Sequence, residues 1–150
     1  MSDVWLAKEA DLPAVVALYM DFRDWWGRGG PPDESYPASV SRLLDDPNTD
    51  ILLAGGPDGL AALRYRFVVW TESEECELED LFIRETARGQ GLGRTLLAAA
   101  IDRARERGCR RMLVETNETN APALALYEAH GFSAWIDTVG GNNLHLRRDL

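Results

Sequence analysis

Arg88-Gly89-Gln90-Gly91-Leu92-Gly93 separates a strand-like run, residues 77–83, from a helical run, residues 92–107. Glycine at alternate positions lets the backbone turn tightly and leaves its N–H groups uncovered where the helix begins. Each N–H donated to a charged oxygen contributes about 1.5–3 kcal/mol, and the helix dipole adds roughly 0.3–1 kcal/mol. The stretch therefore predicts an anion-binding turn that can hold a pyrophosphate.

Two common nucleotide-binding motifs do not fit this stretch. A dinucleotide fingerprint, G-x-G-x-x-G, would place its third glycine at Arg94 or at Leu96. A Walker loop needs Gly-Lys followed by Ser or Thr, and the sequence contains no such tripeptide. The pattern that does fit is [Q/R]-x-x-G-x-[G/A], matched by Arg88, Gly91 and Gly93.

A second pattern, N-x-x-A-x-x-x-Y-x-x-x-G-F, occupies residues 120–132. Asn120 is a good N-cap, Pro122 belongs in a first helical turn, and Gly131 follows the last turn. Together the two patterns resemble those of the GNAT superfamily of N-acetyltransferases, and most closely its polyamine (diamine) acetyltransferase branch. The resemblance covers nearly the whole chain.

The order of expected elements also resembles that family. The expected strands are 4–7, 51–54, 60–70, 77–83, 112–116, 132–136 and 144–148, and the expected helices start at 11, 35 or 37, 92 and 120. Residues 25–32 are expected to form a loop. The predicted fold class is α/β (α+β), with a mixed central sheet of about seven strands, a bulged central strand and flanking helices. One domain is expected over residues 1–150.

The strand at residues 77–83 changes its apolar face partway along. Leu78 lies on one parity of the two-residue alternation, whereas Leu81 and Ile83 lie on the other, so the alternation slips near Asp80. Such a slip predicts a β-bulge, although an edge irregularity without function would leave the same pattern.

The resemblance implies direct transfer of an acetyl group from acetyl-CoA to a primary amine, with no metal. Backbone N–H groups near the bulge could polarise the thioester carbonyl. Helix capping explains Asn120 as well as cofactor contact does. The implied cofactor contacts are Leu81, Phe82, Ile83, Arg88, Gly89, Gln90, Gly91, Leu92, Gly93, Arg94 and Asn120.

Two catalytic side chains are implied. Tyr127 matches the family tyrosine that acts as general acid near the CoA sulfur, since a protonated phenol can return a proton to the thiolate; a half-buried packing tyrosine is the alternative. Holding an alkyl amine neutral at pH 7 costs about 4 kcal/mol, so a base is useful. Glu79 is the first choice for that base, directly or through water.

Four side chains are expected to bind the acceptor: Trp25, Trp26, Glu79 and Asp80. The tryptophans adjoin the loop that borders the acceptor site in the resembling family, although two adjacent tryptophans are also common core anchors. The acidic pair matches the polyamine branch. The carboxylates at 72, 74, 75 and 77 are expected to be a solvated turn and strand edge, and the arginines at 103, 105, 107, 110 and 111 a solvated cluster that suits the helix dipole.

Composition narrows the class of protein. A net charge of −9 argues against nucleic-acid binding, and no apolar run approaches the roughly 20 residues of a membrane span. The N-terminus lacks the basic start of a signal peptide, so a soluble, cytoplasmic chain is expected. Cys76 and Cys109 have no metal-ligand spacing and are expected to be free thiols.

Three functions remain open. The leading hypothesis is an acetyltransferase for a small cationic amine, either polyamine-like or aminoglycoside-like. The second keeps the chemistry but acetylates protein lysines or N-termini. The third, from another class, is a CoA-binding sensor module without turnover. The resemblance also implies a homodimer.

Overall fold

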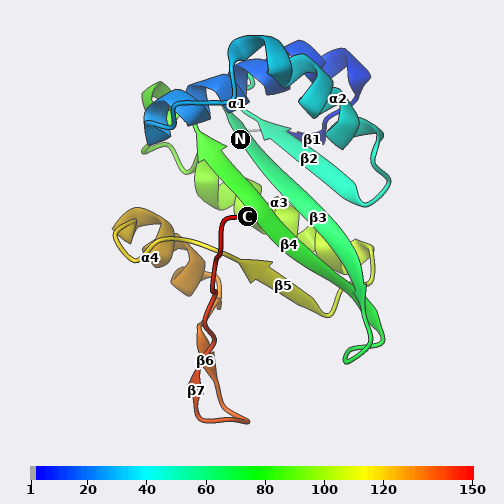
Figure 1. Cartoon of the computed structure of the whole chain (residues 1–150), viewed down its shortest axis with the longest axis vertical. Coiled ribbons are helices and arrows are strands. Elements are labelled where there is room, and N and C mark those ends of the chain that lie inside the picture. The colour runs from blue at the N-terminus through cyan, green and yellow to red at the C-terminus, as the bar shows by residue number, and fades with distance from the viewer. Residues whose placement is uncertain (1–2) are drawn as a thin grey trace. The chain divides into compact units, whose positions relative to one another are not determined.

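The computed structural model describes residues 3–150, which form seven strands and four α-helices (Figure 1). The strands are β1 (Val4–Leu6), β2 (Thr49–Ala54), β3 (Gly59–Val68), β4 (Ser73–Ile83), β5 (Arg111–Val114), β6 (Trp135–Ile136) and β7 (Gly141–Asn142). The helices are α1 (Leu12–Trp26), α2 (Tyr36–Asp45), α3 (Leu92–Glu106) and α4 (Ala121–Ala129). The chain divides into two compact units, the first ending at Leu113 and the second covering Val114–Leu150.

Five strands form the main sheet, in the order β1-β2-β3-β4-β5. The first four are antiparallel neighbours, with Leu53 opposite Trp5 on one side and opposite Leu60 on the other. Helix α3 connects β4 to β5, and the arrows of these two strands run the same way in Figure 1, which makes the sheet mixed. Strands β6 and β7 form a second sheet. The predicted fold class is confirmed.

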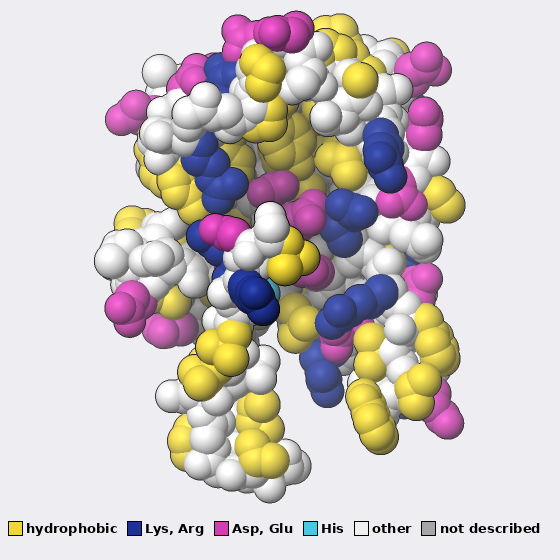
Figure 2. Space-filling view, viewed as in Figure 1, with side chains coloured by type: hydrophobic (Ala, Val, Ile, Leu, Met, Phe, Trp, Pro, Cys, Tyr) yellow, Lys and Arg dark blue, Asp and Glu magenta, His cyan; other side chains and the backbone are white. Residues whose placement is uncertain are grey.

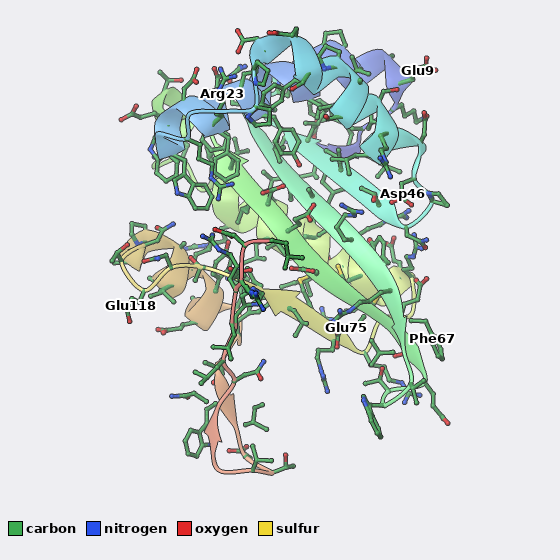
Figure 3. All side chains as sticks on the ribbon, in the orientation of Figure 1. Glu9, Arg23, Asp46, Phe67, Glu75 and Glu118 are labelled. Atoms are coloured by element: carbon green, nitrogen blue, oxygen red, sulfur yellow. The ribbon has the colours of Figure 1, made fainter. Side chains whose placement is uncertain are left out.

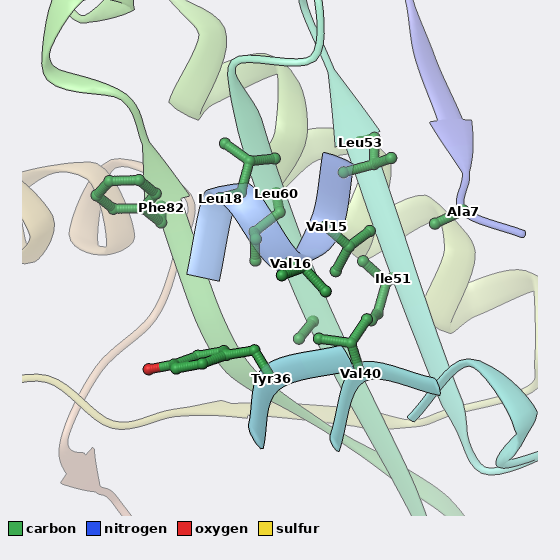
Figure 4. Close-up of a cluster of buried hydrophobic side chains, with 11 residues drawn as sticks. Ala7, Val15, Val16, Leu18, Tyr36, Val40, Ile51, Leu53, Leu60 and Phe82 are labelled. Carbon is green, nitrogen blue, oxygen red and sulfur yellow. The ribbon is translucent and has the colours of Figure 1, made fainter. Parts of the chain in front are cut away.

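Helices α1 and α2 pack together over an apolar cluster on β2 and β3 (Figure 4). Val15 and Leu18 of α1 are fully buried, and they meet Val40 of α2 and Ile51 of β2. Burying a side chain of this size contributes about 1.5–3 kcal/mol. The helical spacing of these residues therefore fixes α1 against the sheet.

Strand β4 carries a β-bulge near its end. Ala62 of β3 lies opposite Asp80, and the next pair in the ladder is Leu63 with Leu78, so Glu79 is skipped. The slip predicted near Asp80 is confirmed. Because one extra residue shifts the alternation, side chains beyond the bulge change faces of the sheet.

Gly59, the first residue of β3, is packed too closely for a side chain. A Cβ at this position would lie 2.6 Å from Ile83 Cδ1 and 2.9 Å from Leu96 Cδ1. We expect Gly59→Val to lower the free energy of unfolding by about 1–3 kcal/mol through overpacking, measured by urea unfolding. Gly29→Val is the control, because a Cβ there meets nothing within 4 Å. Equal losses in both variants would contradict this account.

Arg103 of α3 and Arg107, which caps the end of that helix, form tertiary ion pairs. Arg103 Nε donates to Asp50 Oδ2 at 2.7 Å, and Arg107 Nε donates to Glu74 Oε2 at 2.6 Å. The Arg107 guanidinium also lies 4.0 Å from the ring centroid of Tyr65. The prediction of a solvated cluster is wrong for these two, because the fold brings carboxylates of β2 and β4 within their reach.

Glu75 is likewise not on a solvated edge. Its carboxylate on β4 (Figure 3) is 3% exposed and accepts from Arg66 at 2.9 Å and from Arg111 at 3.3 Å. The prediction of a solvated position is wrong for Glu75, since arginines from two other segments cover it. A buried carboxylate needs such partners to remain charged.

The end of the first helix differs from expectation, and one expected strand is absent. Helix α1 continues through Trp25 and Trp26 and ends at Gly27, whose φ is 72°, so the loop predicted from residue 25 begins later. Glycine adopts this left-handed conformation at little cost and ends the helix there. The strand predicted at 144–148 is wrong, since the structure assigns residues 143–150 to no strand. Alternating Leu144 and Leu146 supply the pattern, but a strand also needs a neighbouring backbone.

In the second unit, helix α4 has the predicted caps. Asn120 Oδ1 accepts from the Ala123 N–H at 3.3 Å, and Gly131 follows the helix with φ of 87°. His130 Nδ1 lies 2.8 Å from the Leu126 carbonyl oxygen. This contact ties the His130 side chain to the last turn of the helix.

Candidate functional site

The glycine turn before α3 has the geometry of an anion site. Gly89 and Gly91 have φ of 77° and 80°, and a Cβ on either would meet nothing within 4 Å. Within residues 3–150, the N–H groups of residues 91–94 donate to no backbone carbonyl outside the helix, and Thr95 makes the first bond, to the Gly91 oxygen at 3.0 Å. These N–H groups carry the positive end of the helix dipole. The turn can therefore receive phosphate oxygens.

The side chains of this turn have separate roles. Leu92 is 6% exposed and packs near Gly55 and Gly59, so it offers a ligand only its backbone. Gln90 and Arg94 are exposed. An exposed arginine in the first turn can reach a bound phosphate by its own flexibility.

Arg88 connects the turn to β4 and to α1. Its Nε donates to the Ile83 carbonyl oxygen at 2.9 Å, and its guanidinium lies 4.5 Å from the ring centroid of Trp25 and 5.7 Å from that of Phe82. A cation over an aromatic face is attracted by the ring quadrupole. The structure thus brings together four of the predicted site residues.

An aromatic cluster joins the end of α1 to β4. Phe22 stacks on Phe82 with ring centroids 4.8 Å apart and on Trp26 at 5.3 Å. Trp25 lies 6.2 Å from Phe82. Both tryptophans remain about half exposed, at 47% and 53%, so each is part anchor and part free surface. Arg88 lies over the ring of Trp25 and Arg28 lies 4.1 Å from the ring centroid of Trp26, so the exposed part of each tryptophan adjoins a guanidinium.

The two acidic residues of the bulge have different surroundings. Glu79 is exposed and pairs with Arg64 Nη1 at 3.2 Å. Asp80 is partly buried, and its Oδ2 accepts from the Tyr19 hydroxyl at 2.9 Å. Burial raises the pKa of the Asp80 carboxyl, an effect that the Tyr19 hydrogen bond opposes. Figure 2 shows a recess over β3 and β4, below α1 and α2, with apolar and acidic side chains on its floor.

Two predicted site residues belong to the second unit. Tyr127 of α4 is 8% exposed and meets the edge of the Phe132 ring at a centroid distance of 5.8 Å. Asn120 caps the same helix. The structure describes their local surroundings, and their cofactor roles stay predictions.

Two residues near Asp80 were not identified from the sequence. Tyr19, on the helix expected from residue 11, and Arg64, on the strand expected at 60–70, belong to no sequence motif. Both meet the acidic pair through contacts 61 and 15 residues apart in the chain. Helical spacing could have shown that Tyr19 shares a face with Phe22, but not which strand that face covers.

Within residues 3–150, no three His, Cys, Asp or Glu side chains are grouped so that they could hold a metal ion. None of the helices in that range is both long and apolar enough to cross a membrane.

Comparison with known proteins gives consistent matches. Residues 14–132 match the model of the "Acetyltransferase (GNAT) family". An IAA acetyltransferase from Azospirillum brasilense is 33% identical over 89% of this chain and 86% of its own, and an aminoglycoside N(6')-acetyltransferase type 1 from Serratia marcescens is 30% identical over 87% and 84%. The crystal structure of a protein from Arthrobacter sp. FB24, assigned as an acetyltransferase, has a TM-score of 0.90 and 31% identity and covers 99% of this chain and 96% of its own.

Proposed function

This chain belongs to the acetyltransferase (GNAT) family and is an acyltransferase, and on that premise we propose that it moves an acetyl group from acetyl-CoA to a primary amine of a small cationic molecule. The observation that carries the proposal is the Asp80 carboxylate, partly buried at the bulge with its pKa raised. A carboxylate in this state attracts an ammonium group and can accept its proton.

The glycine turn fits the pyrophosphate of acetyl-CoA. Its open positive-φ positions leave room for a ligand to approach the backbone, and its free N–H groups suit an anion. Acetyl-CoA supplies the acetyl thioester when bound. The backbone of residues 81–83 is proposed to pair with its pantetheine arm, and the Phe82 N–H to polarise the carbonyl.

We assign the base to Asp80 rather than to Glu79, the first choice from the sequence. Arg64 engages the Glu79 carboxylate, and Glu79 faces solvent. Asp80 has one oxygen fixed by Tyr19, and burial favours its uptake of a proton. Glu79 is then a binding group that draws the cationic acceptor toward Asp80, and Trp25 and Trp26 line its approach.

Two acceptor classes follow from different observations. The aminoglycoside acetyltransferase relative supports an aminoglycoside-like acceptor, whereas the Glu79–Asp80 pair supports a polyamine-like one. The family resemblance also leads us to propose a homodimer, which sedimentation velocity would test.

The proposal is tested by release of CoA thiol from acetyl-CoA. The acceptors are polyamines, aminoglycosides, amino acids and lysine-containing peptides, each assayed with wild-type protein. Turnover with one class of small amine is the expected result. Turnover with peptides alone would indicate protein acetylation. Acetyl-CoA binding without turnover of any amine would favour the sensor module.

Gly91→Ala tests the turn itself. Because Gly91 has φ of 80°, a Cβ there costs roughly 1–2 kcal/mol of backbone strain. The free turn can relax to avoid this strain, whereas the bound turn has to carry it. We therefore expect acetyl-CoA to bind about tenfold more weakly, since every 1.4 kcal/mol changes the affinity about tenfold. Isothermal titration calorimetry measures the affinity, with Gly29→Ala as the control. Unchanged affinity in Gly91→Ala would count against this turn as the phosphate site.

A further inference from the structure

Tyr19 is the partly buried partner of the proposed base. It lies on α1, whereas Asp80 lies on β4, 61 residues further along the chain, and the bond between them measures 2.9 Å. The Tyr19 ring packs against the apolar cluster of α1, α2 and the sheet. Burial and then the Asp80 carboxylate raise the pKa of Tyr19 well above its ordinary value, so the phenol remains a donor. A donor held this rigidly can fix the orientation of a carboxylate.

The second oxygen of Asp80 has a different environment. Among residues 3–150, Oδ2 accepts from Tyr19, and no hydrogen bond to Oδ1 occurs. No fully buried side-chain oxygen or nitrogen in that range lacks a partner. Oδ1 must therefore be reachable from solvent. One oxygen is anchored in the protein, and the other is left open to solvent.

We propose that Tyr19 is a positioning residue for the acetyl-transfer reaction, holding Asp80 Oδ2 so that Oδ1 is aimed at the incoming amine. This inference rests on the proposed function, in which Asp80 takes the proton. The step adds one proton to Oδ1 and leaves the amine nitrogen neutral, with its lone pair free to attack the thioester carbonyl. Tyr19 gives up no proton.

The groups around Asp80 determine whether its pKa rises or falls when the Tyr19 hydroxyl is removed. Burial and the neighbouring Glu79 raise the pKa of Asp80, whereas the Tyr19 hydrogen bond and the guanidiniums of Arg28 and Arg64 lower it. Tyr19 comes from α1, Arg28 follows that helix, Arg64 comes from β3 and Glu79 from β4. Removing the Tyr19 hydroxyl therefore raises the pKa of Asp80 further.

The test is Tyr19→Phe, which keeps the ring and deletes the donor. A hydrogen bond to a charged group contributes about 1.5–3 kcal/mol, which corresponds to roughly one to two pH units. We expect the acidic limb of kcat/KM against pH to move upward by roughly one to two units, with the KM for acetyl-CoA unchanged. Carbon-13 NMR titration of the Asp80 carboxyl, assigned with Asp80→Asn, should show the same shift without any turnover.

Tyr65→Phe is the matched control, since Tyr65 donates to Asp50 Oδ2 over the same 2.9 Å in the same unit. Tyr65→Phe should leave both the pH profile of kcat/KM and the NMR titration of Asp80 unchanged. An unchanged Asp80 titration in Tyr19→Phe would overturn the positioning role. The Asp80 NMR titration could shift in Tyr19→Phe while the wild type turns over no amine. That result would support the Tyr19–Asp80 contact and overturn only the proposed function.

Discussion

Asp80→Asn is expected to lower kcat/KM for the amine by about 10²–10³-fold, the usual contribution of a general base. The amide keeps an oxygen that accepts from the Tyr19 hydroxyl, so the local contact survives while the proton acceptor is lost. Initial rates of CoA thiol release across pH measure the effect. The wild type should show an acidic limb above the ordinary range of an aspartate, because burial raises the pKa of Asp80, and the variant should lack that limb.

Stability provides the control for this variant. A carboxyl whose pKa is raised by folding stabilises the fold at pH below its unfolded pKa and loses that contribution as pH rises through the folded pKa. At neutral pH the ionised Asp80 therefore lowers the free energy of unfolding, and its replacement by Asn removes this destabilisation. The melting temperature of Asp80→Asn at pH 7 should be at least that of the wild type. A large fall in melting temperature would mean that lost activity reflects unfolding.

Glu79→Gln tests whether Glu79 and Asp80 have different roles. Glu79 is exposed and paired with Arg64, so its loss should change mainly the KM for the acceptor, by about tenfold or less. The reverse ranking, with Glu79→Gln more damaging to kcat than Asp80→Asn, would return the base to Glu79.

Tyr127→Phe is expected to lower kcat by about 10²-fold while acetyl-CoA affinity stays the same, because the departing thiolate loses its proton donor. The ring and its edge contact with Phe132 remain, so packing of α4 is conserved. Single-turnover assays and calorimetry measure the two quantities. Tyr36→Phe, a buried tyrosine of α2, serves as the control.

An experiment that varies the acetyl donor gives Tyr127 an independent readout. A thioester with a better leaving group than CoA thiolate needs less help from an acid, so acetyl thioesters of more acidic thiols should narrow the difference in kcat between Tyr127→Phe and wild type. A constant gap across thioesters would assign the loss to positioning instead of to proton transfer.

Local patterns predicted the elements that depend on neighbouring residues alone. The glycine turn, the caps at Asn120 and Gly131, and the slip in the strand at Asp80 are all set within a few residues, and the structure has each of them. Two predictions failed at positions whose structure depends on a partner from elsewhere in the chain. Glu75 is buried under two arginines, and the strand expected at residues 144–148 does not form.

The sequence by itself determined the family, the glycine turn before α3 and the acidic pair at the bulge, because spacing and backbone propensity act over short distances. Only the tertiary structure distinguishes the surroundings of the two carboxylates. It buries Asp80 against Tyr19 and leaves Glu79 with Arg64 in solvent, through contacts that no local pattern contains. Desolvation and long-range hydrogen bonds set the pKa of a carboxyl, and both exist only after the chain has folded.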